Sequence, residues 1–173
     1  AEINQAAAAI YREAAGNTRH VAGSIGPTGK MLLMGDVTET ELLDTFTEQA
    51  IALEEGGADI IIVETMSAAD EASLAVRAAR AATGCTVIIT MTFSMGLNGD
   101  YHTMMGVSPE EMVILMKEAG AHIIGSNCGN GIRDMIAVAR AIRSADDKIP
   151  VIIQANAGLP ELIEGMAVFR DSP

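Results

Sequence analysis

The stretch AHIIGSNCGNG, residues 121–131, contains an apolar run, a polar end and a glycine-rich turn, in that order. A helical pattern begins directly afterwards, at Ile132. This succession of strand, turn and helix is typical of a parallel α/β protein, in which ligands meet the carboxyl ends of the strands. Cys128 lies at such an end. Its thiol is therefore a candidate nucleophile or metal ligand, although free cysteine is also among the most often buried residue types.

The same pattern repeats along the chain. Apolar runs rich in Ile and Val alternate with helical patterns, as expected of strands that are buried on both faces. The predicted strands are 20–25, 59–64, 86–93, 122–127 and 151–156. The predicted helices are 3–15, 39–55, 68–82, 109–119 and 132–144, and a short helix is expected to start at Pro160. Glycine follows most of these helices, which is a common stop signal.

The spacing of the strands fits two architectures. Successive strands begin roughly 27 to 39 residues apart, and a (β/α)8 barrel uses about 31 residues per unit. A doubly wound sheet fits nearly as well. Only five strands are found in 173 residues, whereas a barrel has eight. The periodicity therefore leaves two possibilities, an open parallel α/β sheet or a piece of a TIM barrel, in either case as one undivided domain over residues 1–173.

Composition and charge exclude several classes of protein. The chain is 49% hydrophobic, which argues against disorder. Its formal net charge is −12 with only 11 Lys and Arg, which argues against nucleic acid and anionic membrane surfaces as partners. Two cysteines provide no disulfide framework and favour a reducing compartment, so we expect a cytoplasmic protein. No apolar run is long enough to span a membrane.

Polar or glycine-rich residues follow every predicted strand. The first strand leads into GPTG at 26–29, the second ends at Glu64 and Thr65, and the fourth ends at Asn127. The opposite ends of the strands carry only turn residues, so this asymmetry predicts one functional face at the carboxyl ends. Glu64 comes straight after the apolar run 60–63, and we therefore expect it to be partly buried and to have a partner.

Four motifs carry a family resemblance. They are VAGSIGPT at 21–28, ETM at 64–66, GSNCG at 125–129 and QANAGLP at 154–160. Together they resemble the homocysteine S-methyltransferase family, whose barrel binds homocysteine and zinc, and within it the homocysteine domain of cobalamin-dependent methionine synthases. The resemblance runs from near residue 2 to the end of the chain. It implies a (β/α)8 TIM barrel in which residues 20–25 form the third strand and residues 151–156 the seventh.

The resemblance implies an enzyme of methionine biosynthesis that transfers a methyl group to zinc-activated homocysteine. Three cysteines hold the zinc in this family, and Cys128 matches the first of them. The other two form an adjacent pair, which the resemblance places after Pro173, and it places the first two barrel strands before Ala1. Cys85 precedes its strand, on the opposite face, and does not replace the pair. We therefore expect the chain to be a partial domain that is inactive alone.

The resemblance also assigns substrate contacts. It implies that Glu64 accepts the ammonium group of homocysteine, and that Ser24, Gly26, Thr65 and Asn127 complete the substrate site. The backbone amides of the glycine-rich turn after the first strand are expected to take the α-carboxylate. Members of the family use methylcobalamin, methylated sulfonium compounds or betaine as methyl donor, and the sequence does not choose among them. Methylcobalamin on a separate corrinoid domain is one expected partner.

Each candidate residue also has a plainer interpretation. Without the resemblance, Cys128 is more often a buried small residue than a ligand. A glycine cluster is by default a turn that needs positive φ. His102 in a long loop is more often a solvated side chain than a ligand to the donor, and His20 and His122, at the starts of strands, are expected to be structural. For the whole chain, the alternative is a non-catalytic α/β module that has lost the metal site and binds an amino acid or a partner domain.

Overall fold

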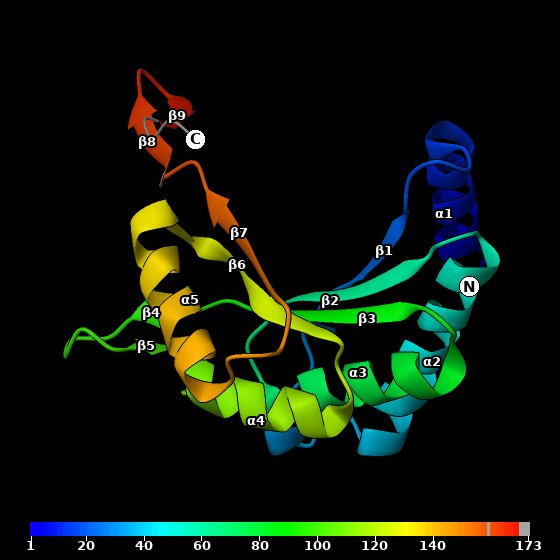
Figure 1. Ribbon diagram of the computed structural model, residues 1–173, viewed down its shortest axis with the longest axis horizontal. Coiled ribbons are helices and arrows are strands. Elements are labelled where there is room, and N and C mark those ends of the chain that lie inside the picture. Colours follow the sequence, from blue (N-terminus) through cyan, green and yellow to red (C-terminus); the bar gives the residue numbers. More distant parts are fainter. Residues whose placement is uncertain (159, 170–173) are drawn as a thin grey trace.

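The chain folds around a curved sheet of five parallel strands (Figure 1). The computed structural model describes residues 1–158 and 160–169. The strands, in their order across the sheet, are β1 (Ala22–Ile25), β2 (Ile60–Met66), β3 (Thr86–Met91), β6 (Ile123–Gly131) and β7 (Val151–Asn156). All their pairings are parallel, so the predicted repeat of strand and helix is confirmed.

Helices cover one face of this sheet. They are α1 (Glu2–Ala15), α2 (Glu39–Glu55), α3 (Ala69–Ala82), α4 (Pro109–Ala119) and α5 (Ile132–Ala145). In Figure 1, α2, α3 and α4 run beneath the sheet, while the opposite, concave face is covered by no helix of the described residues. The strands β1 and β7 lie at the two edges. Within residues 1–158 and 160–169, the sheet is therefore not closed into a barrel.

Both faces of the sheet are apolar, as the continuous Ile and Val runs predict. Ile61 and Val63 are fully buried in the core that the helices form with the sheet. Ile62 and Ile88, which are paired neighbours on the concave face, are nearly buried but lie outside that core. Side chains that alternate along a strand point to opposite faces. The concave face is therefore a second apolar surface.

One glycine sets the distance between two strands. Gly125 of β6 pairs with Ile152 of β7. A Cβ atom at position 125 would lie 1.8 Å from the carbonyl oxygen of Ile152, which is far too close for any side chain. The GSNCG motif therefore begins with a residue that the sheet itself requires.

The helix starts follow signals in the sequence. Ser108 precedes α4, and its Oγ accepts the N–H of Glu111 at 3.2 Å, while the Glu111 carboxylate accepts the N–H of Ser108 at 2.9 Å. Thr38 and Glu41 form the same reciprocal pair at the start of α2. Such capping boxes satisfy N–H groups that have no partner inside the helix.

Several elements differ from the predicted ones. The structure adds a hairpin of β4 (Ser94–Met95) and β5 (Tyr101–His102), a 3-10 helix η1 (Leu32–Met34), and a hairpin of β8 (Pro160–Ile163) and β9 (Met166–Phe169). The short helix predicted from Pro160 is wrong, because this segment is β8. Glu164 and Gly165, between the two strands, have φ values of 52° and 80°. Two consecutive positive φ angles make the tight turn that joins hairpin strands and cannot continue a helix.

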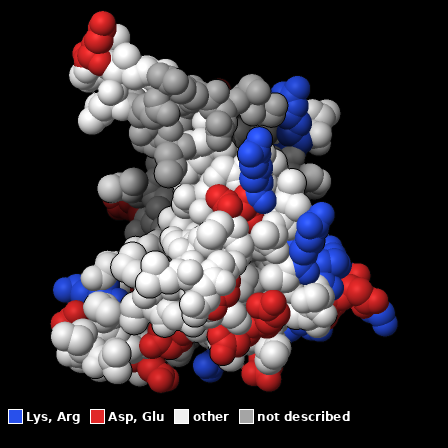
Figure 2. Space-filling model, turned by 90° about the vertical axis from the view of Figure 1, so that its left-hand side faces the viewer, with Lys and Arg blue, Asp and Glu red and all other residues white. Residues whose placement is uncertain are grey.

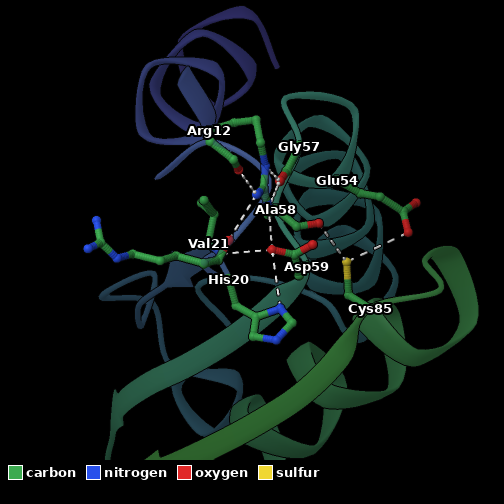
Figure 3. A network of polar contacts seen from close by, with 10 residues as sticks. Arg12, His20, Val21, Glu54, Gly57, Ala58, Asp59 and Cys85 are labelled. Carbon is green, nitrogen blue, oxygen red and sulfur yellow. Dashed lines mark hydrogen bonds and ion pairs between the residues drawn. The ribbon is translucent and has the colours of Figure 1, made fainter. Parts of the chain in front are cut away.

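A polar network ties α1 to the amino ends of the strands (Figure 3). Arg12 of α1 donates from Nε and Nη2 to the carbonyl oxygen of Gly57, at 2.9 and 2.8 Å, and also binds the Asp59 carboxylate. The same carboxylate accepts the N–H of Val21 at 2.8 Å. His20 Nδ1 lies 3.7 Å from it. Asp59 therefore joins α1, β1 and β2 at the end of the sheet opposite the predicted site.

Cys85 belongs to this same end. It directly precedes β3, and its Sγ lies 3.3 Å from the carbonyl oxygen of Ala58 and 3.6 Å from Glu54 Oε1 (Figure 3). Burial raises the pKa of the Cys85 thiol, and the nearby Glu54 carboxylate adds to the shift. A buried thiol with a raised pKa is unreactive. The expectation that Cys85 lies away from the carboxyl ends is confirmed.

We expect Asp59→Asn to lower the urea midpoint at pH 7, because the N–H of Val21 and the Arg12 guanidinium hold the pKa of Asp59 below its ordinary value. A carboxylate whose pKa is lower in the folded state stabilises the fold above its unfolded pKa of about 3.9, and the stabilisation is lost as the pH falls below that value. The difference between wild type and variant should therefore shrink at pH 3. Asp44→Asn, on the exposed surface of α2, is the matched control. A difference that stays constant with pH would contradict the assignment.

Candidate functional site

Polar side chains from β1 and β2 meet at the carboxyl edge of the sheet. Ser24 of β1 donates from Oγ to Glu64 Oε1 of β2 at 2.5 Å. Glu64 is half-buried, so the predicted partial burial and the predicted presence of a partner are both confirmed.

A second cluster joins β2, β3 and β6. Asn127 of β6 is 4% exposed. Its Oδ1 accepts the N–H of Thr65 at 2.9 Å and the hydroxyl of Thr90 at 2.8 Å. Its Nδ2 donates to Thr65 Oγ1 at 2.8 Å and to Cys128 Sγ at 3.3 Å. Thr65, Asn127 and Cys128 therefore lie together, next to Glu64.

Two residues of this cluster have left-handed backbone conformations. The φ angles of Thr65 and Cys128 are 62° and 56°. A left-handed residue other than glycine costs roughly 1–2 kcal/mol, and a β-branched residue such as threonine is rare there. The register of the sheet also shifts at both places, between Val63 and Met66 and between Asn127 and Gly131. Backbone strain of this kind gathers at functional sites and persists only where the surroundings hold it.

The Cys128 thiol is accessible. Cys128 is exposed, whereas Cys85 is buried. Gly129, which also has a positive φ of 75°, follows Cys128 where a Cβ would meet Thr92 Cγ2 at 2.8 Å. Thr92 Oγ1 in turn donates to the carbonyl oxygen of Asn127 at 3.0 Å. The turn after β6 is therefore fixed against the loop after β3, with the thiol on its open side.

Three further residues of this edge, which the sequence did not mark as site residues, support the cluster. Thr90 and Thr92 support Asn127 from β3 and the loop after it, and Asn130 Nδ2 donates to the carbonyl oxygen of Phe93 at 2.7 Å. Thr90 is completely buried. A threonine between the apolar residues Ile89 and Met91 of a buried strand is the signal that would have indicated a hydrogen-bonded role for it.

The glycine-rich turn after β1 is bound to the start of α3. The N–H and hydroxyl of Thr28 both donate to Glu71 Oε1, at 2.8 and 2.6 Å. Glu71 is 5% exposed, so this acid supports the turn. The N–H of Thr28 is thereby occupied, and Gly26, which is exposed directly after β1, stays the predicted contact for a substrate carboxylate.

A cavity of about 300 Å³ lies beside this turn rather than over the polar cluster. Its lining includes Lys30, Met31, Ser67 and Met105, and it includes neither Glu64 nor Cys128. The cavity is mainly apolar and does not contain the polar side chains of the carboxyl edge. The candidate site is therefore defined by the hydrogen-bonded side chains and not by this cavity.

The three histidines lie outside the cluster. His122 Nδ1 accepts the N–H of Val87 at 2.8 Å, and partial desolvation, with the nearby charge of Arg80, lowers the pKa of this largely exposed imidazole. His20 lies near Asp59 at the opposite end of the sheet. His102 Nδ1, in the β4–β5 hairpin, is 3.8 Å from Asp100 Oδ2. These contacts place His20 and His122 at the amino ends of the strands, as predicted, and their structural role stays a prediction.

A zinc ion does not fit the described side chains alone. Catalytic zinc takes three protein ligands and keeps a fourth position open. Within residues 1–158 and 160–169, no group of three His, Cys, Asp or Glu side chains could hold a metal ion. Cys128 therefore needs ligands from outside the described residues if it is to bind zinc.

The surface charge is mixed. Exposed arginines on α5 include Arg133, Arg140 and Arg143. On the face shown in Figure 2, basic side chains lie mainly along the right-hand side and acidic side chains mainly toward the bottom, with uncharged surface between them. In the part of the chain that the structure describes, no helix combines the length and the apolar character needed to cross a bilayer.

The chain is similar to known homocysteine methyltransferases. The family model "Homocysteine S-methyltransferase" matches residues 1–172. The methionine synthase of Mycobacterium tuberculosis is 29% identical over 170 residues, which are 93% of this chain and 14% of that protein. Betaine–homocysteine S-methyltransferase 1 of Danio rerio is 34% identical over 128 residues, 73% of this chain and 30% of that protein.

A solved structure shows the same fold. The apo form of the homocysteine methyltransferase MmuM from Escherichia coli superposes with a TM-score of 0.64 at 20% identity, over 79% of this chain and 49% of that one. The five-stranded sheet thus corresponds to part of a TIM barrel, and the chain spans half or less of the length of these proteins. Since the family match extends over residues 1–172, the chain belongs to the homocysteine S-methyltransferase family.

Proposed function

We propose that this chain forms the homocysteine-binding part of an enzyme that methylates homocysteine to methionine. The observation that carries the proposal is the gathering of Ser24, Glu64, Thr65 and Cys128 at one edge of the sheet, in a chain of this family. The homocysteine sulfur, having lost its proton, attacks an electrophilic methyl carbon. A new S–C bond forms, and the donor leaves with the electron pair of its bond to the methyl group.

In this proposal Glu64 binds the substrate ammonium group. Ser24 holds Oε1, while Oε2 has no hydrogen-bond partner among the described residues. A half-buried carboxylate with one free oxygen favours a charge-assisted bond to an ammonium group. Gly26 and Thr65 flank Glu64 at the same edge and supply further contacts to the amino acid.

We also propose that Cys128 is one of three zinc ligands, the other two coming from outside the described residues. Thiolates suit zinc, and zinc in turn deprotonates a bound thiol, which makes homocysteine a nucleophile at neutral pH. A related structure of MmuM carries the description "Metallated form", with a TM-score of 0.59 and 20% identity. The exposed position of the Cys128 thiol supports the assignment.

The methyl donor is proposed by class. The names of the relatives include methionine synthase, betaine–homocysteine S-methyltransferase and S-methylmethionine–homocysteine S-methyltransferase. We propose methylcobalamin on a separate corrinoid domain as the first donor to test, since the mycobacterial methionine synthase matches 93% of the chain. A cytoplasmic location, which the two free cysteines favour, completes the proposal.

The substrate assignment predicts a measurable loss. In a longer polypeptide that contains these residues and binds homocysteine, Glu64→Gln should weaken binding by about 1.5–3 kcal/mol, because a hydrogen bond to a charged group is lost. This corresponds to a roughly 10- to 150-fold higher Kd by calorimetry. Zinc content should stay unchanged, because Glu64 is not a proposed ligand.

Glu13→Gln, on the exposed surface of α1, is the matched control and should leave the Kd unchanged. An unaltered affinity in Glu64→Gln would place the ammonium group elsewhere. Homocysteine binding without methyl transfer from any of the donor classes would favour the alternative, a non-catalytic module that binds an amino acid.

A further inference from the structure

The side chain of Asn127 has no hydrogen-bonding capacity left for a ligand. A side-chain amide has two N–H donors and an oxygen with two acceptor positions. Both donors are used, toward Thr65 Oγ1 and Cys128 Sγ, and Oδ1 accepts from the N–H of Thr65 and from Thr90 Oγ1. A buried amide that is fully bonded in this way can orient its neighbours, but it cannot also bind a substrate group.

The orientation of this amide is fixed by the backbone. The N–H of Thr65 can only donate, so the atom of Asn127 that lies 2.9 Å from it must be the oxygen. The nitrogen must then face Thr65 Oγ1 and the Cys128 sulfur. The hydrogen bond to the thiol is therefore a consequence of the main-chain contact.

The left-handed turn decides where the thiol lies. Ile124 and Ser126 point to the helix side of β6 and are completely buried. Because side chains alternate along a strand, an extended residue 128 would point to that same side. Cys128 is instead exposed, with a φ of 56°. The turn thus lifts the thiol out of the layer between sheet and helices and places it on the open edge.

We propose that Asn127 is a positioning residue that holds the Cys128 thiol at the open edge and does not contact homocysteine. The purpose of this positioning, to present the thiol to the proposed zinc ion beside Glu64, rests on the proposed function. Asn127 also forms hydrogen bonds with the other left-handed residue, Thr65, at both the N–H and the hydroxyl of Thr65. A single side chain therefore fixes both strained positions.

The test uses a longer polypeptide that contains these residues, freed of metal by a chelator and kept without homocysteine, so its result does not depend on catalysis. The rate of alkylation by N-ethylmaleimide at one fixed pH is measured separately for Cys128 and Cys85 by peptide mass spectrometry. In Asn127→Ala, the turn should relax toward the extended conformation and the thiol should turn inward. We expect the alkylation rate of Cys128 to fall about tenfold, while that of Cys85 stays unchanged. A factor of about ten is the population ratio that corresponds to the energy cost of one left-handed residue.

The matched control is Asn130→Ala, which removes an amide hydrogen bond to Phe93 from the same turn and should leave the Cys128 rate unchanged. General loosening of the fold would be recognised by a different result, because it would raise the alkylation rate of the buried Cys85. If Asn127→Ala also raises the Cys85 rate, the variant Thr65→Val replaces it in the test. Thr65→Val removes only the acceptor of the hydrogen bond from Asn127 Nδ2, and it should also lower the alkylation rate of Cys128. A Cys128 rate that is unchanged or faster in the folded variant overturns the proposal.

Discussion

In a longer polypeptide that contains these residues and binds zinc, Cys128→Ala should abolish bound zinc and methyl transfer together. A metal site that loses one of three protein ligands falls below the number that catalytic zinc needs. The expected change in metal content is from stoichiometric to near zero after dialysis, measured by plasma mass spectrometry. The 173-residue chain itself should bind zinc weakly or not at all, because among the described residues Cys128 is the only cysteine at this edge.

The second cysteine of the chain provides the control. Cys85 is buried at the amino ends of the strands, against Ala58 and Glu54. Cys85→Ala should therefore leave zinc content and methyl transfer unchanged, apart from a loss of stability. Stoichiometric zinc retained by Cys128→Ala would remove Cys128 from the ligand set, and the exposed thiol would then be a feature of the turn alone.

The 173-residue chain purified alone should self-associate or aggregate. Within the described residues, β1 and β7 each present one unpaired edge, and unpaired edges template pairing with other chains. The exposed side of α1 adds apolar surface through Ile3, Ile10 and Tyr11, which are 86%, 67% and 69% exposed. Sedimentation velocity should show species larger than a monomer, and thermal unfolding should be broad.

Two comparisons identify which surface drives the association. Ile10→Glu places a charge on the exposed side of α1 and should reduce association only in part if the sheet edges dominate. Supplying parallel strands to both edges, in a longer polypeptide, should give a monomer with a cooperative transition. A sharp monomeric peak from the 173-residue chain would show that the five-stranded sheet is self-sufficient, and would favour the non-catalytic module.

The sequence predicted the regular elements well, because their signals are local. The apolar strands and the glycine stops placed all five strands of the main sheet, and 39–55, 109–119 and 151–156 agree with α2, α4 and β7 residue for residue. The β4–β5 hairpin was missed although Asn98-Gly99 is a strong turn signal. The segment from Pro160 was predicted wrongly because a proline often starts a helix, whereas here the turn at Glu164 and Gly165 decides.

The site was predicted as a set of residues but not as a network. Motifs predicted Glu64 and Cys128 as candidate site residues, and the order of the strands brings both to the carboxyl edge. The bonds from Asn127 to Thr65 and Thr90 join residues that are 62 and 37 positions apart. Their geometry depends on the register of three strands and on two left-handed residues. No local pattern indicates a positive φ at a threonine or a cysteine, because both residue types usually avoid it.

The strand β2 connects two polar groups with separate tasks. Asp59, just before β2, fastens α1 to the amino ends, and Glu64 lies at the carboxyl end. Five residues of extended chain separate them by about 17 Å, and substitutions at that distance have effects on unfolding that add independently. An evolving or engineered lineage can therefore adjust the heat tolerance of the scaffold at one end of β2, while the proposed recognition of the substrate ammonium group is selected separately at the other.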